Sequence, residues 1–388
     1  MRFKQNRYIP TNSAKRKLKR NQSNSFMQLI DLKSQYQRYK SQIDANIHRV
    51  LDHGQFIMGP EIIQLEEALA RYVSVKHCVS VASGTDSLEI ALRALKIGPG
   101  DEVITVPFTW ISSAEVISQV GATPVFVDID IATYNVDSNK IESAITPRTR
   151  AIIAVSLFGQ MADYESINRI AERHGITVIE DAAQSFGATQ NGRKSCSVTK
   201  ISSTSFFPAK PFGCYGDGGA LFTSNDDLAD AMRAIRSHGG TSRHHHTLVG
   251  MNGRLDTIQA AILLAKLPFF ESEVINRGRL GARYSAALAS HCVVPIIAPQ
   301  NTHVYAQYTV RIPNRAVLSK RLEAKGIPTS VYYPKCLHEQ PVYKSLGYPL
   351  GSFPNSELAS REVISLPICP FLTEADQDLV IESFIRSC

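Results

Sequence analysis

The sequence predicts an α/β fold in which a mostly parallel sheet, flanked by helices, is followed by a smaller α+β domain. From Cys78 to about Ser224, short apolar and β-branched runs alternate with helical stretches, and this alternation is typical of βαβ units. A second observation is that this regular alternation of strands and helices ends after about Cys292. We therefore expect an extension at 1–26, a large domain at 27–266, and a connecting helix with a smaller C-terminal domain at 267–388.

The individual elements follow from periodicity and punctuation. Apolar residues recur every three or four positions from Leu29 to Leu51, and Pro60 precedes a second helical stretch at 61–73. In the alternating region the expected strands are 103–106, 124–127, 151–155 and 177–180, with a helix at 164–174 that Asp163 caps. Beyond it we expect helices at 256–266, 271–289 and 316–325 and a strand at 307–312.

Composition places the chain among ordinary soluble enzymes. Its 388 residues, 44% of them apolar and 20% charged, suffice for a large core. The net charge of +7 includes eight basic and no acidic residues at 1–26, so subtracting eight leaves −1 for the remainder. Charge therefore gives no support for nucleic-acid binding by the body of the protein. Seven scattered cysteines without CxxC spacing indicate reduced thiols and a cytoplasmic protein, and without 18 consecutive apolar residues we expect no membrane span.

The basic extension has two interpretations. Its segment KRKLKR, at 15–20, has the composition of a polybasic arm for nucleic acid or an anionic membrane. The alternative, which we favour, is a disordered segment upstream of the functional chain. It lacks the apolar core of a secretory signal.

The stretch SSTSFFPAKPFGCYGDGG, at 202–219, holds the central candidate residue. Lys210 follows a β-prone apolar run, is closed off by Pro211 and precedes four glycines within seven residues. An arbitrary lysine is usually a surface charge. Because proline fixes φ and glycine permits close backbone approach, these neighbours predict a lysine that is held in one position beside a ligand.

Two further segments complete a constellation. An apolar run at 177–179 ends in Glu180 and Asp181, which predicts a carboxylate at the C-terminal edge of a buried parallel strand. A strand followed by Ser83, Gly84 and Thr85 and then a helix predicts a phosphate cradle. A reactive amine, a carboxylate and a phosphate cradle are what pyridoxal 5'-phosphate requires.

These segments resemble the DegT/DnrJ/EryC1/StrS family of sugar aminotransferases, which are fold-type I pyridoxal-phosphate enzymes. The resemblance extends from about Met27 onward and includes FIMGPEIIQLEEALARY (56–72), GDEVITVPFTWISSAEVI (100–117), GMNGRLDTIQAAIL (250–263) and YYPKCLHEQPVY (332–343). The motif SFFPxKPxGCYGDGGA and a histidine-rich loop at 244–246 resemble most the subgroup that aminates a 3-keto UDP-N-acetylglucosaminuronate. Where that subgroup usually has His-Tyr and Pro, this chain has Tyr332-Tyr333 and Cys336.

The resemblance implies roles for further cofactor residues. Trp110 would stack on the cofactor ring, although a lone tryptophan is more often a core residue. Gln184 would reach the phenolic oxygen, or is a helix-surface glutamine. Ser205 would bind the phosphate, and Asn252 would cross a homodimer interface to the phosphate of the other subunit. Lys210 and Asp181 would be the catalytic residues.

The resemblance also implies substrate residues. Arg254 would bind a carboxylate of L-glutamate or of the uronic acid, or else pairs with Asp256 or a helix end. His244 and His245 would belong to a recognition loop for the nucleotide sugar. The side chains of Tyr332, Tyr333 and His338 would lie where the second domain closes over the substrate. Three successive histidines without CxxC or HExxH do not predict a metal site.

The function expected from these parts is transfer of an amino group from L-glutamate to a UDP-linked 3-keto sugar for bacterial surface polysaccharide (O-antigen) synthesis. Lys210 argues against the dehydratase branch of the family, which has His there. A 4-amino or dTDP-3-amino sugar synthase shares all the cofactor residues and stays open. A regulatory or nucleic-acid-binding protein would depend on residues 1–20 alone.

Overall fold

The computed structural model describes residues 27–242 and 244–388, so the expected extension at 1–26 lies outside the described residues. The described part begins with two helices, α1 (Leu32–His53) and α2 (Pro60–Val73). Asp31 caps α1, since its carboxylate accepts a hydrogen bond from the Ser34 amide at 2.9 Å. Both helices lie where the sequence periodicity predicts them.

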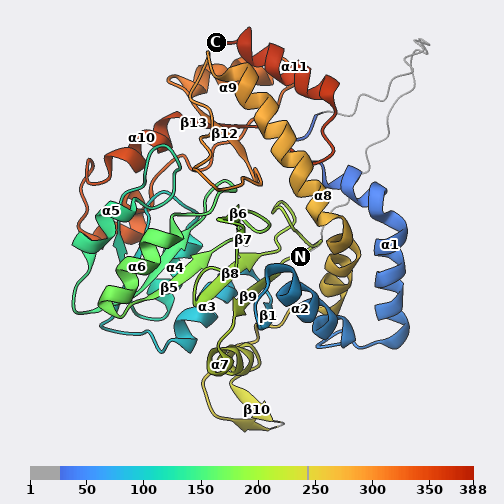
Figure 1. Cartoon of the computed structure of the whole chain (residues 1–388), viewed down its shortest axis with the longest axis vertical. Helices are drawn as coiled ribbons and strands as arrows, with labels where there is room; N and C mark the ends of the chain where they lie inside the picture. Colours follow the sequence, from blue (N-terminus) through green and yellow to red (C-terminus); the bar gives the residue numbers. More distant parts are fainter. Residues whose placement is uncertain (1–26, 243) are drawn as a thin grey trace, which may run out of the picture.

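The central sheet has seven strands in the order β1-β9-β8-β5-β4-β2-β3 (Figure 1). The two pairings of β9, with β1 and β8, are antiparallel and the other four in this sheet are parallel, so the predicted α/β class with a mostly parallel sheet is confirmed. Along β4, Ile152 packs into one apolar cluster and Ile153 into another, so both faces of the sheet are covered. The strands are β1 (His77–Val81), β2 (Glu102–Thr105), β3 (Thr123–Phe126), β4 (Thr149–Val155), β5 (Thr177–Asp181), β8 (Ile201–Ser205) and β9 (Gly219–Thr223).

Helices between the strands cover the sheet. The predicted cap of α6 is confirmed, because Asp163 accepts a hydrogen bond from the Ser166 amide at 3.2 Å. These helices are α3 (Gly84–Ala94), α4 (Ser112–Gln119), the short α5 (Ser138–Ile141) with the 3-10 turn η1 (Glu142–Ala144), α6 (Tyr164–His174) and α7 (Asp226–Arg236). Two small hairpins are β6 (Thr189–Gln190) with β7 (Arg193–Lys194), and β10 (Gly240–Ser242) with β11 (His245–His246).

One long helix, α8 (Thr257–Leu288), runs from the large domain to the C-terminal part of the chain (Figure 1). The prediction of two separate helices, 256–266 and 271–289, is wrong, because the helix continues through Pro268. A proline removes one backbone donor, but buried side chains on both sides of it, Leu263 and Phe270 among them, hold the helix against its neighbours. The expected domain boundary at 266/267 therefore falls inside a helix.

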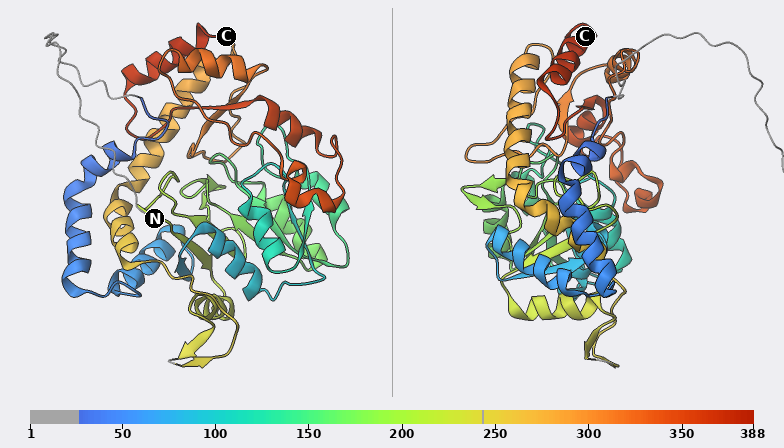
Figure 2. Two further views of the ribbon diagram at one scale, coloured as in Figure 1. Left: turned by 180° about the vertical axis from the view of Figure 1, so that it is seen from behind. Right: turned by 90° about the vertical axis from the view of Figure 1, so that its right-hand side faces the viewer.

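The C-terminal part packs on the end of α8 (Figure 2). The antiparallel strands β12 (Tyr308–Arg311) and β13 (Val363–Leu366) share an apolar cluster with Leu280 and Tyr284 of α8. The helices there are α9 (Arg315–Glu323), α10 (Pro354–Glu362) and α11 (Glu374–Ile385), with 3-10 turns η2 (Leu337–Glu339) and η3 (Pro341–Leu346). No helix among the described residues is both long and apolar enough to span a bilayer.

Candidate active site

Asp181 lies at the edge where the parallel strands end. It is the last residue of β5 and pairs in register with Ser203 of β8, so both strands present their C-terminal ends together. The carboxylate is buried and accepts hydrogen bonds from the Ser113 hydroxyl at 3.0 Å and the Ala183 amide at 3.1 Å. Burial raises the pKa of Asp181, and the Ala183 amide, the Lys210 charge and the Ser113 hydroxyl oppose that rise.

Lys210 stands on a tight turn directly after β8. Its amide donates to the Phe207 carbonyl at 2.9 Å. The turn closes at Gly213, where a Cβ would lie 2.6 Å from the carbonyl oxygens of Phe207 and Pro208. Burial lowers the pKa of the Lys210 amine, and the negative charge of Asp181 opposes this shift. A lowered pKa increases the fraction of neutral, nucleophilic amine.

The two groups share one electrostatic environment. Each charge shifts the pKa of the other, yet no direct ion pair joins Lys210 and Asp181 in the part of the chain that the structure describes. The amine and the acid are therefore near enough to interact electrostatically, and their catalytic roles stay a prediction.

A helix N-terminus meets β8 beside them. Ser83 caps α3, since its hydroxyl accepts a hydrogen bond from the Asp86 amide at 3.0 Å. A Cβ on Gly84 would lie 2.6 Å from Cβ of Ser205, so only glycine permits this approach. The hydroxyl of Thr85 lies 2.7 Å from that of Ser112. Backbone amides at the start of a helix, together with neighbouring hydroxyls, fit a phosphate group.

Together these residues fit pyridoxal phosphate. The chain supplies an amine of lowered pKa, a buried carboxylate and a close contact between Gly84 and Ser205. The donor set is that of an organic phosphate and not of a metal. Among residues 27–242 and 244–388, no group of three or more His, Cys, Asp or Glu side chains is placed to hold a metal ion.

An aromatic wall stands next to this site. Trp110 is 59% exposed, and its ring centroid lies 6.1 Å from that of Tyr333 at an interplanar angle of 41°. Burial raises the pKa of the Tyr333 hydroxyl, which accepts a hydrogen bond from Gln184 at 3.2 Å. The Gln184 side-chain oxygen accepts from the Phe158 amide at 2.8 Å. Gln184 is therefore held by protein groups at both ends, and the ring of Tyr332 lies 6.0 Å from that of Tyr333.

Arg254 and Asn252 lie in the segment that leads into α8. Asn252 is exposed and forms an isolated bridge with Ser237. The Nε of Arg254 is buried and has no hydrogen-bond partner among the described residues. Within the same residues Arg254 forms no ion pair with Asp256, so the structural alternative of an Arg254–Asp256 pair is not realised.

The histidines expected to bind substrate are not all brought to this site. His244 and His245 are exposed on the β10–β11 arm, which projects from the body beyond α7 (Figures 1 and 2). The ring of His338 is buried, with its Nε2 3.3 Å from the carboxylate of Glu357 and its centroid 4.9 Å from that of Phe353. Of the expected substrate residues, Tyr333 forms the aromatic wall together with Trp110, and Tyr332 packs against Tyr333.

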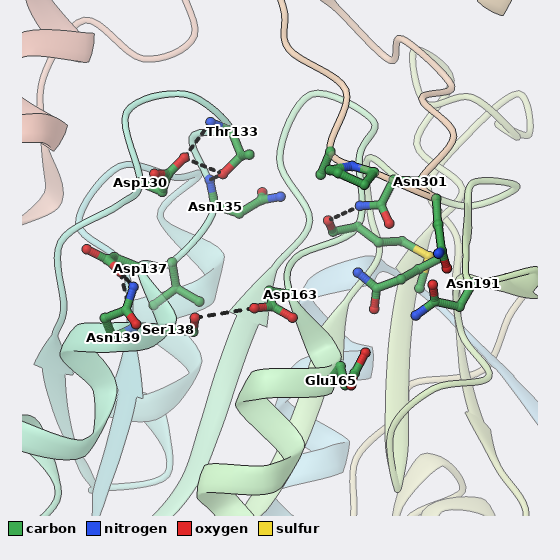
Figure 3. A pocket seen from close by; sticks show the side chains of 16 residues that line it. Asp130, Thr133, Asn135, Asp137, Ser138, Asn139, Asp163, Glu165, Asn191 and Asn301 are labelled. Carbon is green, nitrogen blue, oxygen red and sulfur yellow. Dashed lines mark hydrogen bonds between the residues drawn. The ribbon is translucent and has the colours of Figure 1, made fainter.

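A cavity of about 530 Å³ lies elsewhere, between the loop at 130–139, the start of α6 and the segment at 298–301 (Figure 3). None of the expected cofactor or substrate residues lines it. Asp130, Asp137, Asp163 and Glu165 give it four carboxylates. Because these charges repel a nucleotide diphosphate, we do not assign the cavity to the nucleotide sugar.

One functional contact was not predicted from the sequence. Ser113 donates to Asp181, and a serine in the first turn of α4, 68 positions away, carries no local signal of that contact. The motif around Trp110 places the start of α4 next to the site, and that is the only available clue.

Comparison with known proteins agrees with the family resemblance seen in the sequence. The family model described as the DegT/DnrJ/EryC1/StrS aminotransferase family matches residues 37–385. The UDP-2-acetamido-2-deoxy-3-oxo-D-glucuronate aminotransferase of Pseudomonas aeruginosa is 51% identical over 355 residues, which are 91% of this chain and 98% of that protein. A pleiotropic regulatory protein of Geobacillus stearothermophilus is 44% identical, with 91% and 96% covered. The dTDP-3-amino-3,4,6-trideoxy-alpha-D-glucose transaminase of Streptomyces venezuelae is 40% identical, with 91% and 94% covered.

Solved structures are similar over the whole fold. A DegT DnrJ EryC1 StrS aminotransferase from Brucella abortus has a TM-score of 0.91 at 42% identity and covers 93% of this chain and 99% of its own. NtdA from Bacillus subtilis, crystallised with its bound cofactor PMP, has a TM-score of 0.87 at 30% identity, with 95% and 86% covered.

Proposed function

The chain belongs to the DegT/DnrJ/EryC1/StrS aminotransferase family, and we propose that it transfers the amino group of L-glutamate to the 3-oxo group of UDP-N-acetylglucosaminuronate. As a member of that family it is a pyridoxal-phosphate-dependent sugar aminotransferase. The observation that carries the choice of sugar is the 51% identity, over nearly all of both chains, to an enzyme named for this reaction.

The site residues divide the work of transamination. When bound, pyridoxal phosphate supplies an aldehyde that accepts the amino group and a ring that withdraws electrons. Lys210 would hold the cofactor through its amine, and that amine, when neutral, would be the base that takes the proton from the α-carbon of glutamate. Asp181, held by Ser113 and Ala183, would be the carboxylate that balances the charge of the cofactor ring.

The remaining residues bind and orient. The start of α3, with Gly84, Thr85 and Ser205, receives the phosphate. Trp110, whose exposed ring lies next to that of Tyr333, would stack on the cofactor ring, and Gln184 fixes Tyr333 by a hydrogen bond. His338 is omitted from this scheme because its ring is buried against Glu357 and Phe353.

A carboxylate on the substrate would accept a hydrogen bond from the buried Nε of Arg254. Its buried Nε has no partner among the described residues, and both proposed substrates carry a carboxylate. An uncompensated guanidinium donor favours a uronic acid sugar over its neutral analogue.

We propose further that the protein works as a homodimer in the cytoplasm and serves bacterial surface polysaccharide, such as O-antigen, synthesis. The exposed Asn252 and the exposed, projecting arm of His244 and His245 support a partner subunit, since these side chains are accessible to one. In the dimer they would contribute to the partner's site.

The dTDP-3-amino sugar activity stays a second candidate, because a relative named for it is 40% identical. Turnover with glutamate and three keto sugars separates them: the UDP-linked 3-keto uronate, the UDP-linked 3-keto sugar with a C6 hydroxyl, and a dTDP-linked 3-keto sugar. We expect kcat/KM to be about 100-fold higher for the uronate, because with the neutral sugars the buried Nε of Arg254 would keep no acceptor. Equal or higher kcat/KM for either competitor would refute the proposed sugar.

A further inference from the structure

A buried lysine on the long helix reaches the backbone of the catalytic turn. Lys266, on α8, is 2% exposed. Its ammonium donates a hydrogen bond to the carbonyl oxygen of Gly213, three residues beyond Lys210. Among the described residues, Lys266 makes no hydrogen bond to Lys210 or Asp181, so any effect on the reaction passes through this carbonyl.

The turn that receives this hydrogen bond is closed and has little freedom. The Cys214 amide donates to the Phe206 carbonyl at 2.8 Å, and the Lys210 amide donates to Phe207. Gly213 has backbone on the side where a Cβ would stand. A second hydrogen bond joins the turn to α8: the Tyr215 amide donates to the side-chain oxygen of Gln259 at 2.9 Å and fixes the end of the turn.

Charged and titratable groups surround the ammonium on every side described. Glu273 and Arg277 face it from α8, and Cys214 and the ring of Tyr215, 5.4 Å away, face it from the turn. Burial lowers the pKa of Lys266 to about 8, and Glu273 opposes this shift. From α1, Gln35 donates to Glu273 at 3.2 Å, and Tyr39 also lies against that carboxylate.

Two buried opposite charges such as Lys266 and Glu273 are weak evidence for stability, since well-packed apolar residues are often at least as stable. What an apolar side chain does not supply is a donor for the Gly213 carbonyl. We propose that Lys266 is a positioning residue that holds the turn at 207–213, and through it the amine of Lys210, in the reactive geometry. This inference rests on the proposed role of Lys210.

The test compares two variants that differ only in the donor. Glu273→Gln keeps the Lys266 donor and removes the buried carboxylate, whereas Glu273→Gln with Lys266→Met also removes the ammonium; the buried Arg277 is the same in both, so the comparison isolates the donor. A third protein carries Glu273→Gln with Lys266→Gln and keeps an N–H donor. Lys194→Met is the matched control, because Lys194 is a partly buried lysine that pairs with Glu271 and Tyr72, away from the turn.

Two readouts are measured. The first is kcat and KM with glutamate for the holoenzyme. The second, on cofactor-free protein, is the pH midpoint at which the Lys210 amine reacts with acetic anhydride, read by peptide mass spectrometry. A misplaced catalytic group lowers kcat more than it raises KM, by about 10- to 100-fold. A loosened turn admits water and moves the midpoint of Lys210 upward.

We expect both changes in the Lys266→Met double variant relative to Glu273→Gln alone, partial recovery in Lys266→Gln, and neither change in Lys194→Met. If the Lys266→Met double variant matches Glu273→Gln in both readouts, the inference is wrong, whatever happens to its thermal unfolding. A wild-type protein that binds no cofactor at Lys210 would instead refute the proposed function.

Discussion

The charge of Lys210 favours the ionised form of Asp181, and the charge of Asp181 favours the ionised form of Lys210, whereas burial disfavours both ionised forms. Burial raises the pKa of the acid and lowers that of the amine, and the mutual attraction reduces each shift. The pKa values of the acid and the amine are therefore both shifted toward neutral pH, at one edge of the sheet. Such perturbed pairs are typical of catalytic sites.

Replacing Lys210 tests the residue that the account depends on most. Lys210→Ala removes the only proposed base, so kcat for amino transfer should fall by about 1,000-fold or more while the fold persists. Stopped-flow measurement of the half-reaction with glutamate gives the rate, and circular dichroism checks the fold. Lys194→Ala, which alters a lysine outside the site, should retain wild-type activity.

The sequence predicts the residues of the site better than their partners. Lys210, Asp181 and the Gly84 cradle stand out because glycine, proline and strand-end signals are local. Ser113 and the contact between Gln184 and Tyr333 join residues 68 and 149 positions apart, and no local pattern encodes them. The burial of His338 against Phe353 likewise depends on how the C-terminal part folds.

At the scale of elements, α3 and β8 approach so closely that the first residue of the helix must be small. Gly84→Ala would place a methyl group 2.6 Å from Cβ of Ser205 and push the helix from the phosphate position. We expect the dissociation constant for pyridoxal phosphate to rise about tenfold or more, measured by titrating cofactor-free protein.

Gly278→Ala is the matched control for this substitution. Gly278 is a helical glycine of α8 with no atom within 4 Å of an added Cβ. Its replacement should leave cofactor affinity unchanged and slightly raise the unfolding temperature. Equal cofactor affinity in both variants would show that the contact of Gly84 with Ser205 does not shape the phosphate site.

The ends of the helices and strands show which boundaries can be predicted from the sequence and which cannot. The helix expected at 164–174 is found at the same residues, since Asp163 and Gly175 signal both of its ends. Pro268 signalled a break that tertiary packing overrides in α8. The β-prone run before Lys210 leaves the sheet at Ser205, because the chain turns there to present Lys210.

At the scale of the whole molecule, His303 links acid stability to the joint between the large and C-terminal parts. Burial lowers its pKa to about 3 from an ordinary 6.5, and its ring stacks on Tyr305 at 4.0 Å. Between pH 6.5 and 3 the unfolded chain binds the proton more readily, so stability falls as pH falls through this window. The loss from pH 7 to 5 should be about 2 kcal/mol.

His303→Asn keeps an acceptor for the Tyr305 amide and removes the titration. Urea unfolding at pH 7 and pH 5 should show a smaller difference between the two pH values than in wild type. The exposed His291, changed to Asn, should leave the wild-type difference intact. An unchanged difference in His303→Asn would contradict the assignment.

The proposed homodimer can be tested by mixing inactive variants. If Asn252 serves the partner's site, Lys210→Ala and Asn252→Ala chains that exchange subunits form heterodimers in which one site carries both defects and the other none. Random exchange should then restore about one quarter of wild-type activity. No recovery, with exchange verified by mass spectrometry, would place Asn252 in its own chain's site or outside both.

The most direct test of the central claim is to reduce the purified holoenzyme with borohydride and map the modified peptide, with and without prior glutamate. We predict a visible absorbance band that glutamate abolishes, and a pyridoxyl group on Lys210 only in the sample reduced without glutamate. A colourless protein, or a pyridoxyl group on another lysine, would contradict the account.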